Sequence, residues 1–301
     1  MIDETIFSQW IINDDDVISM ASSQIVGADS AKERILQLTR WIYRKMTSDP
    51  PPDDIEIELN HRGSALNSQV DPTLGVLVQY DTEIKKVYSL VRSPHRFAVF
   101  IRVLSIAYRN LVRNDLLTKR SIFYHDPELF QSQGIVDDVV EDVACCLEVP
   151  RTSLNIIASQ KGLVAGPLQW IMKTSDLNNI GETQVVVDCS NKVETIPSII
   201  DSIIAQKTNA IAILVVEKES IFQRIIQSSI IREAIVITAK GVPDYATRLF
   251  VKLLEDSFDL PIVGLFDADP YGAFIFFVYR FGSRSSAYDG MNMAISSMKW
   301  L

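Results

Sequence analysis

The sequence predicts a protein of two domains, a mainly helical α+β domain followed by an α/β domain with a parallel sheet. A chain of 301 residues has the length of about two domains. Residues 94–148 carry apolar side chains at helical spacing, whereas the later part alternates buried strands with helices. Strands that alternate with helices form parallel sheets through right-handed crossovers. We expect three segments: an acidic, loosely structured extension at 1–80, the first domain at 81–175, and the second at 176–301.

Composition excludes several classes of protein. With 47% hydrophobic and 22% charged residues, the chain can bury a core. No apolar run reaches the roughly 18 residues that a membrane span requires, and the opening "MIDETIFSQW" lacks the basic and apolar regions of a secretory signal. The three cysteines show no zinc-ligand spacing, and so few cysteines are typical of a reducing interior.

The first 60 residues are acidic. They hold 12 Asp and Glu against 5 Lys and Arg. One helix is predicted at 31–45, and the proline run at 50–52 prevents its continuation. We therefore expect residues 1–80 to be a loosely packed extension.

A basic segment follows within this acidic chain. Between residues 84 and 120 there are nine Lys and Arg and one acid, Asp115, which gives a local net charge of +8. The helix predicted from residue 94 places Arg102, Arg109 and Arg113 on one stripe opposite its apolar face. Such a stripe is either a solvated helix face or a surface that attracts phosphates, because the field that steers a ligand is local.

Two more helices and a hairpin complete the first domain. A helix is predicted to begin at Lys119, with Thr118 as its N-cap, and to end near Pro127. Another covers 135–148, and two short apolar runs flank a turn at 160–162. Three helices followed by a hairpin are the order of a winged helix, a common nucleic-acid-binding module, although a generic small α+β domain has the same order.

Tyr124 stands out in the second of these helices. A tyrosine side chain is almost wholly protonated at neutral pH, so a tyrosine nucleophile needs a cation or a base beside it. Lys119, Arg120 and His125 are nearby in the sequence. The alternative is that Tyr124 is an ordinary aromatic residue packed on its domain, and the pattern alone leaves both open.

Three acidic residues follow strands of the predicted parallel sheet. Glu217 closes the strand 210–217, and Asp267 and Asp269 follow the strand 261–266. Ligands bind at the carboxyl ends of such strands, and a cluster of like charges favours a compensating cation. Carboxylate oxygens suit Mg²⁺. The sequence therefore predicts a magnesium site, against the alternative that Asp267 and Asp269 only form a turn.

Five segments together resemble the topoisomerase VI A protein and its meiotic relative, the transesterase that makes the double-strand breaks initiating recombination. In chain order they are "TKRSIFYHDPELF", "SQKGLVAG", "ILVVEKESIFQRI", "TAKGVPDYATRLF" and "LFDADPYGAFIFFVYRFGS". The meiotic branch is the more similar, chiefly through "VVEKESIFQR" and "KGVPDYATR". The resemblance covers about residue 92 to the last residue.

The resemblance implies a winged-helix domain of the catabolite-activator type joined to a Toprim domain, which we expect to be incomplete because family members continue further. It implies that Tyr124 attacks a DNA phosphodiester and becomes linked to the 5′ end, with Arg120 assisting at the phosphate. It also implies that Glu217, Asp267 and Asp269 hold Mg²⁺. Two protomers would cut opposite strands, each tyrosine acting with the partner's metal site.

Further expectations come from the same resemblance. Lys161 and Lys240 become candidate DNA contacts, a topoisomerase VI B-like protein becomes the expected partner, and the nucleus the expected location. Two residues depart from the family pattern Asp-Ile-Tyr-Tyr, since Ser121 and Phe123 stand at its first and third positions. Phe123 leaves Tyr124 as the only nucleophile of the motif.

The functions that stay open differ in what they require. A meiotic double-strand-break transesterase is the leading interpretation, and a topoisomerase VI A protein, of the ATP-hydrolysing type II-like class through its partner, is the first alternative. A non-catalytic DNA-binding or assembly module would use only the first domain. A Toprim nuclease or primase would use the acids without Tyr124.

Overall fold

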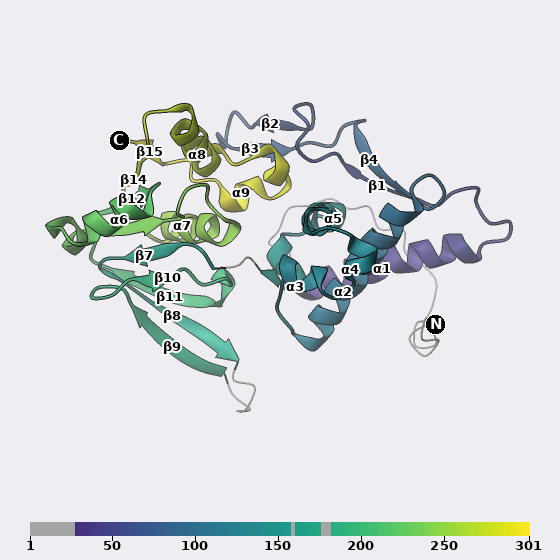
Figure 1. Cartoon of the computed structure of the whole chain (residues 1–301), viewed down its shortest axis with the longest axis horizontal. Coiled ribbons are helices and arrows are strands. Elements are labelled where there is room, and N and C mark those ends of the chain that lie inside the picture. Colours follow the sequence, from purple (N-terminus) through teal and green to yellow (C-terminus); the bar gives the residue numbers. More distant parts are fainter. Residues whose placement is uncertain (1–27, 158–159, 176–181) are drawn as a thin grey trace.

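The computed structural model describes residues 28–157, 160–175 and 182–301. Figure 1 shows two lobes side by side, one mainly helical and one built around a larger sheet. Within the described residues the hydrophobic cores divide in the same way. One core uses side chains from Ala31 to Ile156, and two further clusters use side chains from Leu163 onward.

The helical lobe is assembled from helices that share a core with the paired strands β1 (Glu56–Asn60) and β4 (Lys85–Ser89). Its helices are α1 (Ala28–Thr47), α2 (Pro94–Arg113), α3 (Lys119–Phe123), α4 (Pro127–Phe130) and α5 (Gln133–Cys146). Its strands are β1 (Glu56–Asn60), β2 (Ser68–Val70), β3 (Leu77–Gln79), β4 (Lys85–Ser89), β5 (Leu117–Thr118) and β6 (Ile156–Ile157). The three longest helices expected from apolar spacing are thus present, within a few residues of their predicted ends.

The described part of the N-terminal extension is not loosely packed, which corrects the expectation from the sequence. Ile35 of α1 and Ile57 of β1 are almost fully buried, in the same core as Phe100 of α2. β1 pairs with β4 in antiparallel register across five residues of each strand. The strands β1 and β4 are only five residues long, too short to be predicted from their own pattern, and they share a core with α2 and α5. Residues 1–27 lie outside the described residues.

Within the described residues, the strands on either side of 160–162 do not pair with each other, so the predicted hairpin is wrong. β6 pairs in parallel with β5 of the helical lobe, whereas β7 (Leu163–Ala165) pairs with two strands of the other lobe. The two apolar runs therefore belong to different sheets, and the segment between them connects the lobes. Sequence spacing could not show this, because each run satisfies the pattern of a strand whichever partner it finds.

The second lobe contains the predicted strand–helix alternation. Its remaining strands are β8 (Leu168–Ser175), β9 (Glu182–Asp188), β10 (Glu194–Thr195), β11 (Ile203–Thr208), β12 (Ala212–Val216), β13 (Ala234–Thr238), β14 (Ile262–Leu265) and β15 (Lys299–Trp300). Its helices are α6 (Glu219–Ile226), α7 (Tyr245–Ser257), α8 (Pro270–Phe281) and α9 (Gly290–Met293). Six of these described strands form one sheet in the order β10-β7-β13-β12-β14-β15, with β13, β12, β14 and β15 parallel.

Both faces of this sheet are covered, as apolar strands in a parallel sheet require. Ile213 and Val215 of β12 pack in a core with side chains of α7 and α8, whereas Val216 packs with Phe222 of α6. The alternation follows from the two-residue period of a strand. The helices α7 and α8 cover one face of the sheet and α6 covers the other. β12 ends between these two layers, and Glu217 follows it.

A second, antiparallel sheet extends the core, in the order β11-β8-β9. Leu168 and Trp170 of β8 lie in the same core as Val164 of β7 and Phe250 of α7. The predicted boundary at 175/176 therefore falls between the paired strands β8 and β9, and residues 176–181 lie outside the described residues. The cores separate instead between residues 157 and 163.

The β2–β3 hairpin of the helical lobe reaches across to the second lobe (Figure 1). The amide of Gly63 donates to the carbonyl oxygen of Arg284, 3.2 Å away. A Cβ on Gly290 would lie 2.0 Å from the carbonyl oxygen of Leu77, so only glycine permits this close approach. Across the described ranges, no helix has the length and apolarity to cross a membrane.

Candidate active site and metal site

Tyr124 follows the short helix α3, whose start is fixed by a side-chain cap. The hydroxyl of Thr118 accepts a hydrogen bond from the amide of Ser121 at 3.0 Å and contacts the Ser121 hydroxyl at 2.8 Å. This confirms Thr118 as the predicted N-cap. Ile122 is fully buried under the helix, whereas Tyr124 is 63% exposed. The buried residue anchors the turn and leaves the tyrosine free to meet a macromolecule.

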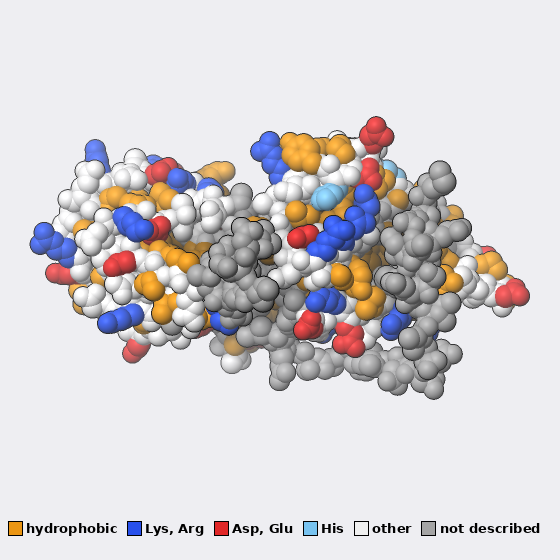
Figure 2. All heavy atoms as spheres, turned by 90° about the horizontal axis from the view of Figure 1, so that it is seen from below, with side chains coloured by type: hydrophobic (Ala, Val, Ile, Leu, Met, Phe, Trp, Pro, Cys, Tyr) orange, Lys and Arg blue, Asp and Glu red, His pale blue; other side chains and the backbone are white. Residues whose placement is uncertain are grey.

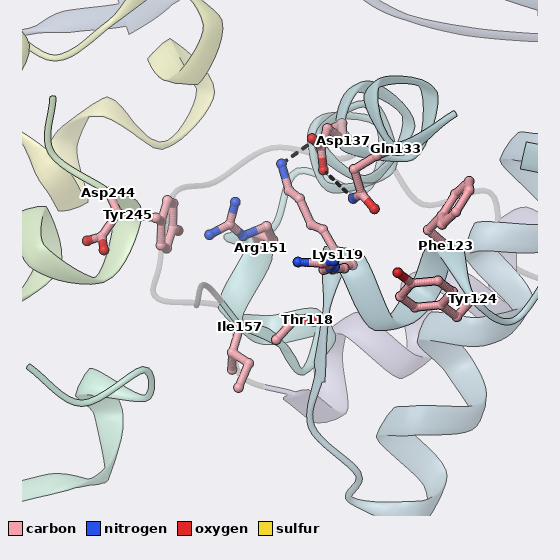
Figure 3. Close-up of a pocket in the computed structure, with 11 residues that line it drawn as sticks. Thr118, Lys119, Phe123, Tyr124, Gln133, Asp137, Arg151, Ile157, Asp244 and Tyr245 are labelled. Carbon is pink, nitrogen blue, oxygen red and sulfur yellow. Dashed lines mark hydrogen bonds between the residues drawn. The ribbon is translucent and has the colours of Figure 1, made fainter. Parts of the chain in front are cut away.

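An open pocket of about 670 Å³ lies beside Tyr124. Its lining residues are Thr118, Lys119, Arg120, Phe123, Tyr124, Gln133, Asp137, Arg151, Ile157, Asp244 and Tyr245. Figure 3 shows the Tyr124 hydroxyl pointing into this pocket from one side and Tyr245 facing it from the other. The pocket therefore lies between the lobes, with Arg120 and Lys119 beside the tyrosine, as expected from the sequence. His125 is exposed but is not among the lining residues.

A buried ionic network closes the deep side of the pocket. Glu141 of α5 accepts from Lys119 at 2.6 Å and from Arg151 at 2.7 Å. Burial raises the pKa of Glu141, but the charges of Arg151 and Lys119 outweigh it and lower the pKa to about 2. Glu141 is thus ionised at any physiological pH, and its negative charge holds both cations in place beside the pocket.

The same network joins the lobes. The guanidinium of Arg151 lies over the ring of Tyr245, 4.3 Å from its centre, a cation–π contact. Tyr288 donates its hydroxyl to Glu141 at 2.6 Å, and Tyr245 donates to Asp289. Two tyrosines of the second lobe therefore contact the charged cluster of the first. Sequence analysis missed Glu141, Arg151, Tyr245 and Tyr288, because their only common signal is contact between residues that lie far apart along the chain.

The predicted acids lie at the carboxyl ends of two neighbouring parallel strands. Glu217 follows β12, and its amide donates to Leu265 of β14 at 3.1 Å. The amide of Asp267 donates to a carboxylate oxygen of Glu217 at 2.9 Å. Asp269 has a different role, since its carboxylate accepts from the Gly272 amide at 2.8 Å and caps α8. The structure brings Glu217 and Asp267 together and directs Asp269 toward the helix.

Lysines surround this edge of the sheet. Lys218 forms an ion pair with Asp267, and Lys240 pairs with Glu219 at 3.1 Å. Lys161 donates to the carbonyl oxygen of Val242 at 3.0 Å. The two lysines predicted as DNA contacts, Lys161 and Lys240, thus lie on neighbouring loops. Lys240 has a φ of 57°, and its amide donates to Thr238, which fixes the turn after β13.

The donor chemistry of this edge fits a hard divalent cation. Glu217 and Asp267 supply carboxylate oxygens, the ligands that Mg²⁺ prefers, and the ammonium of Lys218 already stands beside Asp267 where a cation would be attracted. Within the described ranges, no three His, Cys, Asp or Glu side chains are grouped closely enough to hold a metal ion. One carboxylate oxygen of Asp269, the third acid of the predicted set, accepts the cap hydrogen bond of α8.

Tyr124 and the acids occupy separate places. The pocket at Tyr124 takes Asp244 and Tyr245 from the second lobe, and Glu217, Asp267 and Asp269 are not among its lining residues. The chain thus carries a tyrosine pocket on a helical domain and an acidic strand edge on an α/β domain. This division defines a class of protein in which the candidate nucleophile and the acids come from different domains.

Two family models match these two parts of the chain. The model of the "Type IIB DNA topoisomerase" family matches residues 95–156, which include Tyr124. The model of the Toprim domain shared by Spo11 and the topoisomerase 6 A protein matches residues 212–301, which include the three acids. The predicted Toprim assignment is therefore confirmed for the strand–helix part of the second lobe.

Curated relatives extend the match over most of the chain. Meiotic recombination protein SPO11 of Mus musculus is 35% identical over 247 residues, 81% of this chain and 61% of that protein. The Homo sapiens protein of the same name is 34% identical over 276 residues, 90% of this chain and 68% of the relative. The DNA topoisomerase 6 A protein of Arabidopsis thaliana is 35% identical over 243 residues, 79% of this chain and 55% of the relative.

The chain belongs to the family formed by Spo11 and the topoisomerase 6 A proteins, as the resemblance predicted. It spans between about half and two thirds of the length of these three relatives.

Proposed function

We propose that this chain makes DNA double-strand breaks that initiate meiotic recombination, by tyrosyl transesterification. The hydroxyl oxygen of Tyr124 forms a bond to a backbone phosphorus while the bond from that phosphorus to the 3′ oxygen breaks. The tyrosine gives up its proton, the 3′ oxygen takes one up, and the DNA keeps a 5′-phosphotyrosyl link to the protein. The observation that carries the proposal is the exposed Tyr124, directed into an open pocket beside Lys119 and Arg120.

The remaining residues of the pocket favour a phosphate ligand. Arg120 is exposed on its wall and offers several donors to phosphate oxygens. Lys119 and Arg151 add positive charge that Glu141 only partly neutralises. These cations would stabilise the charge that builds up on the phosphate during attack.

Glu217, Asp267 and Asp269 would hold Mg²⁺, which supplies charge neutralisation to the reacting phosphate. In our proposal the acids serve the tyrosine of a second protomer, because the pocket at Tyr124 is not lined by the acids of its own chain. A dimer would therefore cut both strands.

The helical lobe would bind DNA through its helices, with α2 presenting its exposed Arg109 and Arg113. Figure 2 shows Lys and Arg side chains gathered on one face of this lobe. Lys161 and Lys240 would add contacts from the second lobe, and a topoisomerase VI B-like protein would be the partner. Action on meiotic chromosomes would place the protein in the nucleus.

A topoisomerase VI A protein is the second candidate function, favoured by the 35% identity to the Arabidopsis relative. ATP hydrolysis would then reside in the B-like partner. A strand-passage assay with that partner separates the two, because only a topoisomerase relaxes or decatenates DNA. A non-catalytic binding module is favoured by one observation, the engagement of the Asp269 carboxylate in the cap of α8.

Covalent trapping tests the proposal. The chain and its B-like partner are incubated with end-labelled duplex DNA and Mg²⁺, denatured, and examined for label that stays with protein. We expect a protease-sensitive adduct that Tyr124→Phe and Glu217→Ala both abolish. Tyr43→Phe, a change at a half-exposed tyrosine of α1, is the matched control and should leave the adduct intact. Normal DNA binding without any adduct would instead identify a binding module.

A further inference from the structure

One lysine stands inside the acidic edge without a role in the family pattern described above. Lys218 directly follows Glu217, and its ammonium pairs with the carboxylate of Asp267. The side chains of Lys218 and Asp267 are 53% and 41% exposed. A lysine side chain is charged at neutral pH, so the pair places a positive charge at this edge.

Backbone geometry makes this pair more than an accidental surface contact. The Asp267 amide donates to Glu217 at 2.9 Å, and the Glu217 carbonyl accepts from Gly241 at 2.9 Å. The ends of three neighbouring parallel strands are thereby tied together around the acids. Because Lys218 is the next residue after Glu217, the same backbone bonds hold its main chain beside the acids, and its ammonium reaches Asp267.

We propose that Lys218 is the internal counter-cation of Asp267 in the metal-free protein, and that binding of a divalent cation releases its ammonium to contact a DNA phosphate. The inference rests on the proposed metal site and adds a residue to it. Lys218 is a positioning residue in this proposal, because it acts through the acids and the DNA backbone.

Two physical consequences follow. The ammonium and a divalent cation compete for the same carboxylate, so Lys218 weakens cation binding in the absence of DNA. An exposed ion pair is worth little, so the exchange costs little and is reversible. Once released, the ammonium lies beside a metal-bound phosphate, and a lysine there adds about one counterion to the salt dependence of DNA binding.

Lys240 offers a matched control. It also pairs with an acid at this edge, Glu219, at 3.1 Å, and its side chain is 35% exposed. Glu219 is the first residue of α6 and is not one of the three predicted metal acids. Removing the Lys240 charge therefore changes the local field but frees no metal-binding oxygen.

The first experiment measures Mg²⁺ binding by titration calorimetry on the DNA-free chain. We expect Lys218→Met to bind Mg²⁺ about threefold to tenfold more tightly than the unchanged chain, and Lys240→Met to differ by less than about twofold. Equal affinity in the Lys218→Met and unchanged chains, with binding that Glu217→Ala removes, would overturn the inference and leave the metal site standing. Absence of any Glu217-dependent binding would overturn both.

The second experiment follows the released ammonium. DNA affinity is measured against salt concentration with and without Mg²⁺, all in a Tyr124→Phe background that prevents cleavage. Mg²⁺ should steepen the salt dependence by about one counterion when Lys218 is present and leave it unchanged in Lys218→Met. A steepening that persists in Lys218→Met would show that the new phosphate contact belongs to another residue, and the inference would fail.

Discussion

The charged cluster around Glu141 and the acidic edge around Asp267 contain similar residues in opposite settings. At the lobe junction, the side chains of Glu141 and Arg151 are only 15% and 8% exposed. At the strand edge, Lys218 and Asp267 are each about half exposed. The first cluster joins two lobes, whereas the second lies open at the end of a sheet.

This difference decides what each cluster can do. A buried charge that loses its partner is left in a medium of low polarity, so its partners cannot be exchanged cheaply. An exposed pair exchanges its partner for water or another ion at little cost. The junction is therefore suited to fixing the position of the Tyr124 pocket, and the strand edge to taking up and releasing a cation.

The largest expected effect comes from breaking the junction. Arg151→Met removes a guanidinium that pairs with Glu141 and lies over Tyr245. We expect a loss of about 3–5 kcal/mol in the free energy of unfolding, as for other buried pairs that lose one partner. Urea denaturation measures it, with Arg232→Met, at an exposed arginine, as control. A loss below about 1 kcal/mol would show that the junction contributes no more than a surface pair.

Acid should weaken the same junction. Glu141 has its pKa lowered from 4.5 to about 2 in the folded chain, so its stabilisation is complete above about pH 4.5 and is lost as pH falls toward 2. A shift of this size corresponds to about 3 kcal/mol. Urea denaturation between pH 5 and pH 3 should show the onset of this loss of stability. In Glu141→Gln, the part of the pH dependence of stability that comes from Glu141 should be absent.

Asp289, which accepts from Tyr245, provides the contrast for that measurement. Burial raises its pKa, so its contribution to stability grows as pH falls rather than declines. Asp289→Asn should therefore leave the acid-induced loss in place. If this variant abolished the loss and Glu141→Gln did not, the assignment of the effect to Glu141 would be wrong.

The smallest effect on stability to unfolding is expected from changes at the strand edge. Lys218→Met and Lys240→Met each remove one partner of a surface ion pair. The side chain is 53% exposed for Lys218 and 35% exposed for Lys240. We expect neither change to shift the midpoint of urea denaturation measurably, because exposed ion pairs contribute little to stability. The same urea denaturation measures it. A loss comparable to that of Arg151→Met would mean that the edge is a structural cluster and not an exchangeable one.

Several elements were predictable because their signals are local. The apolar spacing of α2 and α5 and the hydroxyl cap of Thr118 lie within one turn or one helix. The strand–helix order of β12, α6 and β13 predicted the parallel sheet. That order also placed Glu217 and Asp267 at the carboxyl ends of two strands, whereas the direct pairing of β12 with β14 was found only in the structure.

Other features depended on partners far away in the chain. The sequence placed a hairpin at 160–162, but the strands on either side pair with different lobes. We expected residues 1–80 to be loosely packed, but Ile35 and Ile57 lie in the core of the helical lobe. The cap that the Asp269 carboxylate forms on α8 was also not predicted, because it depends on where the helix begins.

By itself, the sequence singled out Tyr124 and the three acids as candidates for chemistry, since the reactivity of a residue type lies in its own side chain. It also determined the helices and parallel strands that present them, because periodicity and capping are local. Only the tertiary structure decided that Arg151 and Glu141 meet the second lobe beside the Tyr124 pocket, and that Lys218 pairs with Asp267. Such pairings depend on which distant surfaces are buried together, and no spacing along the chain encodes that choice.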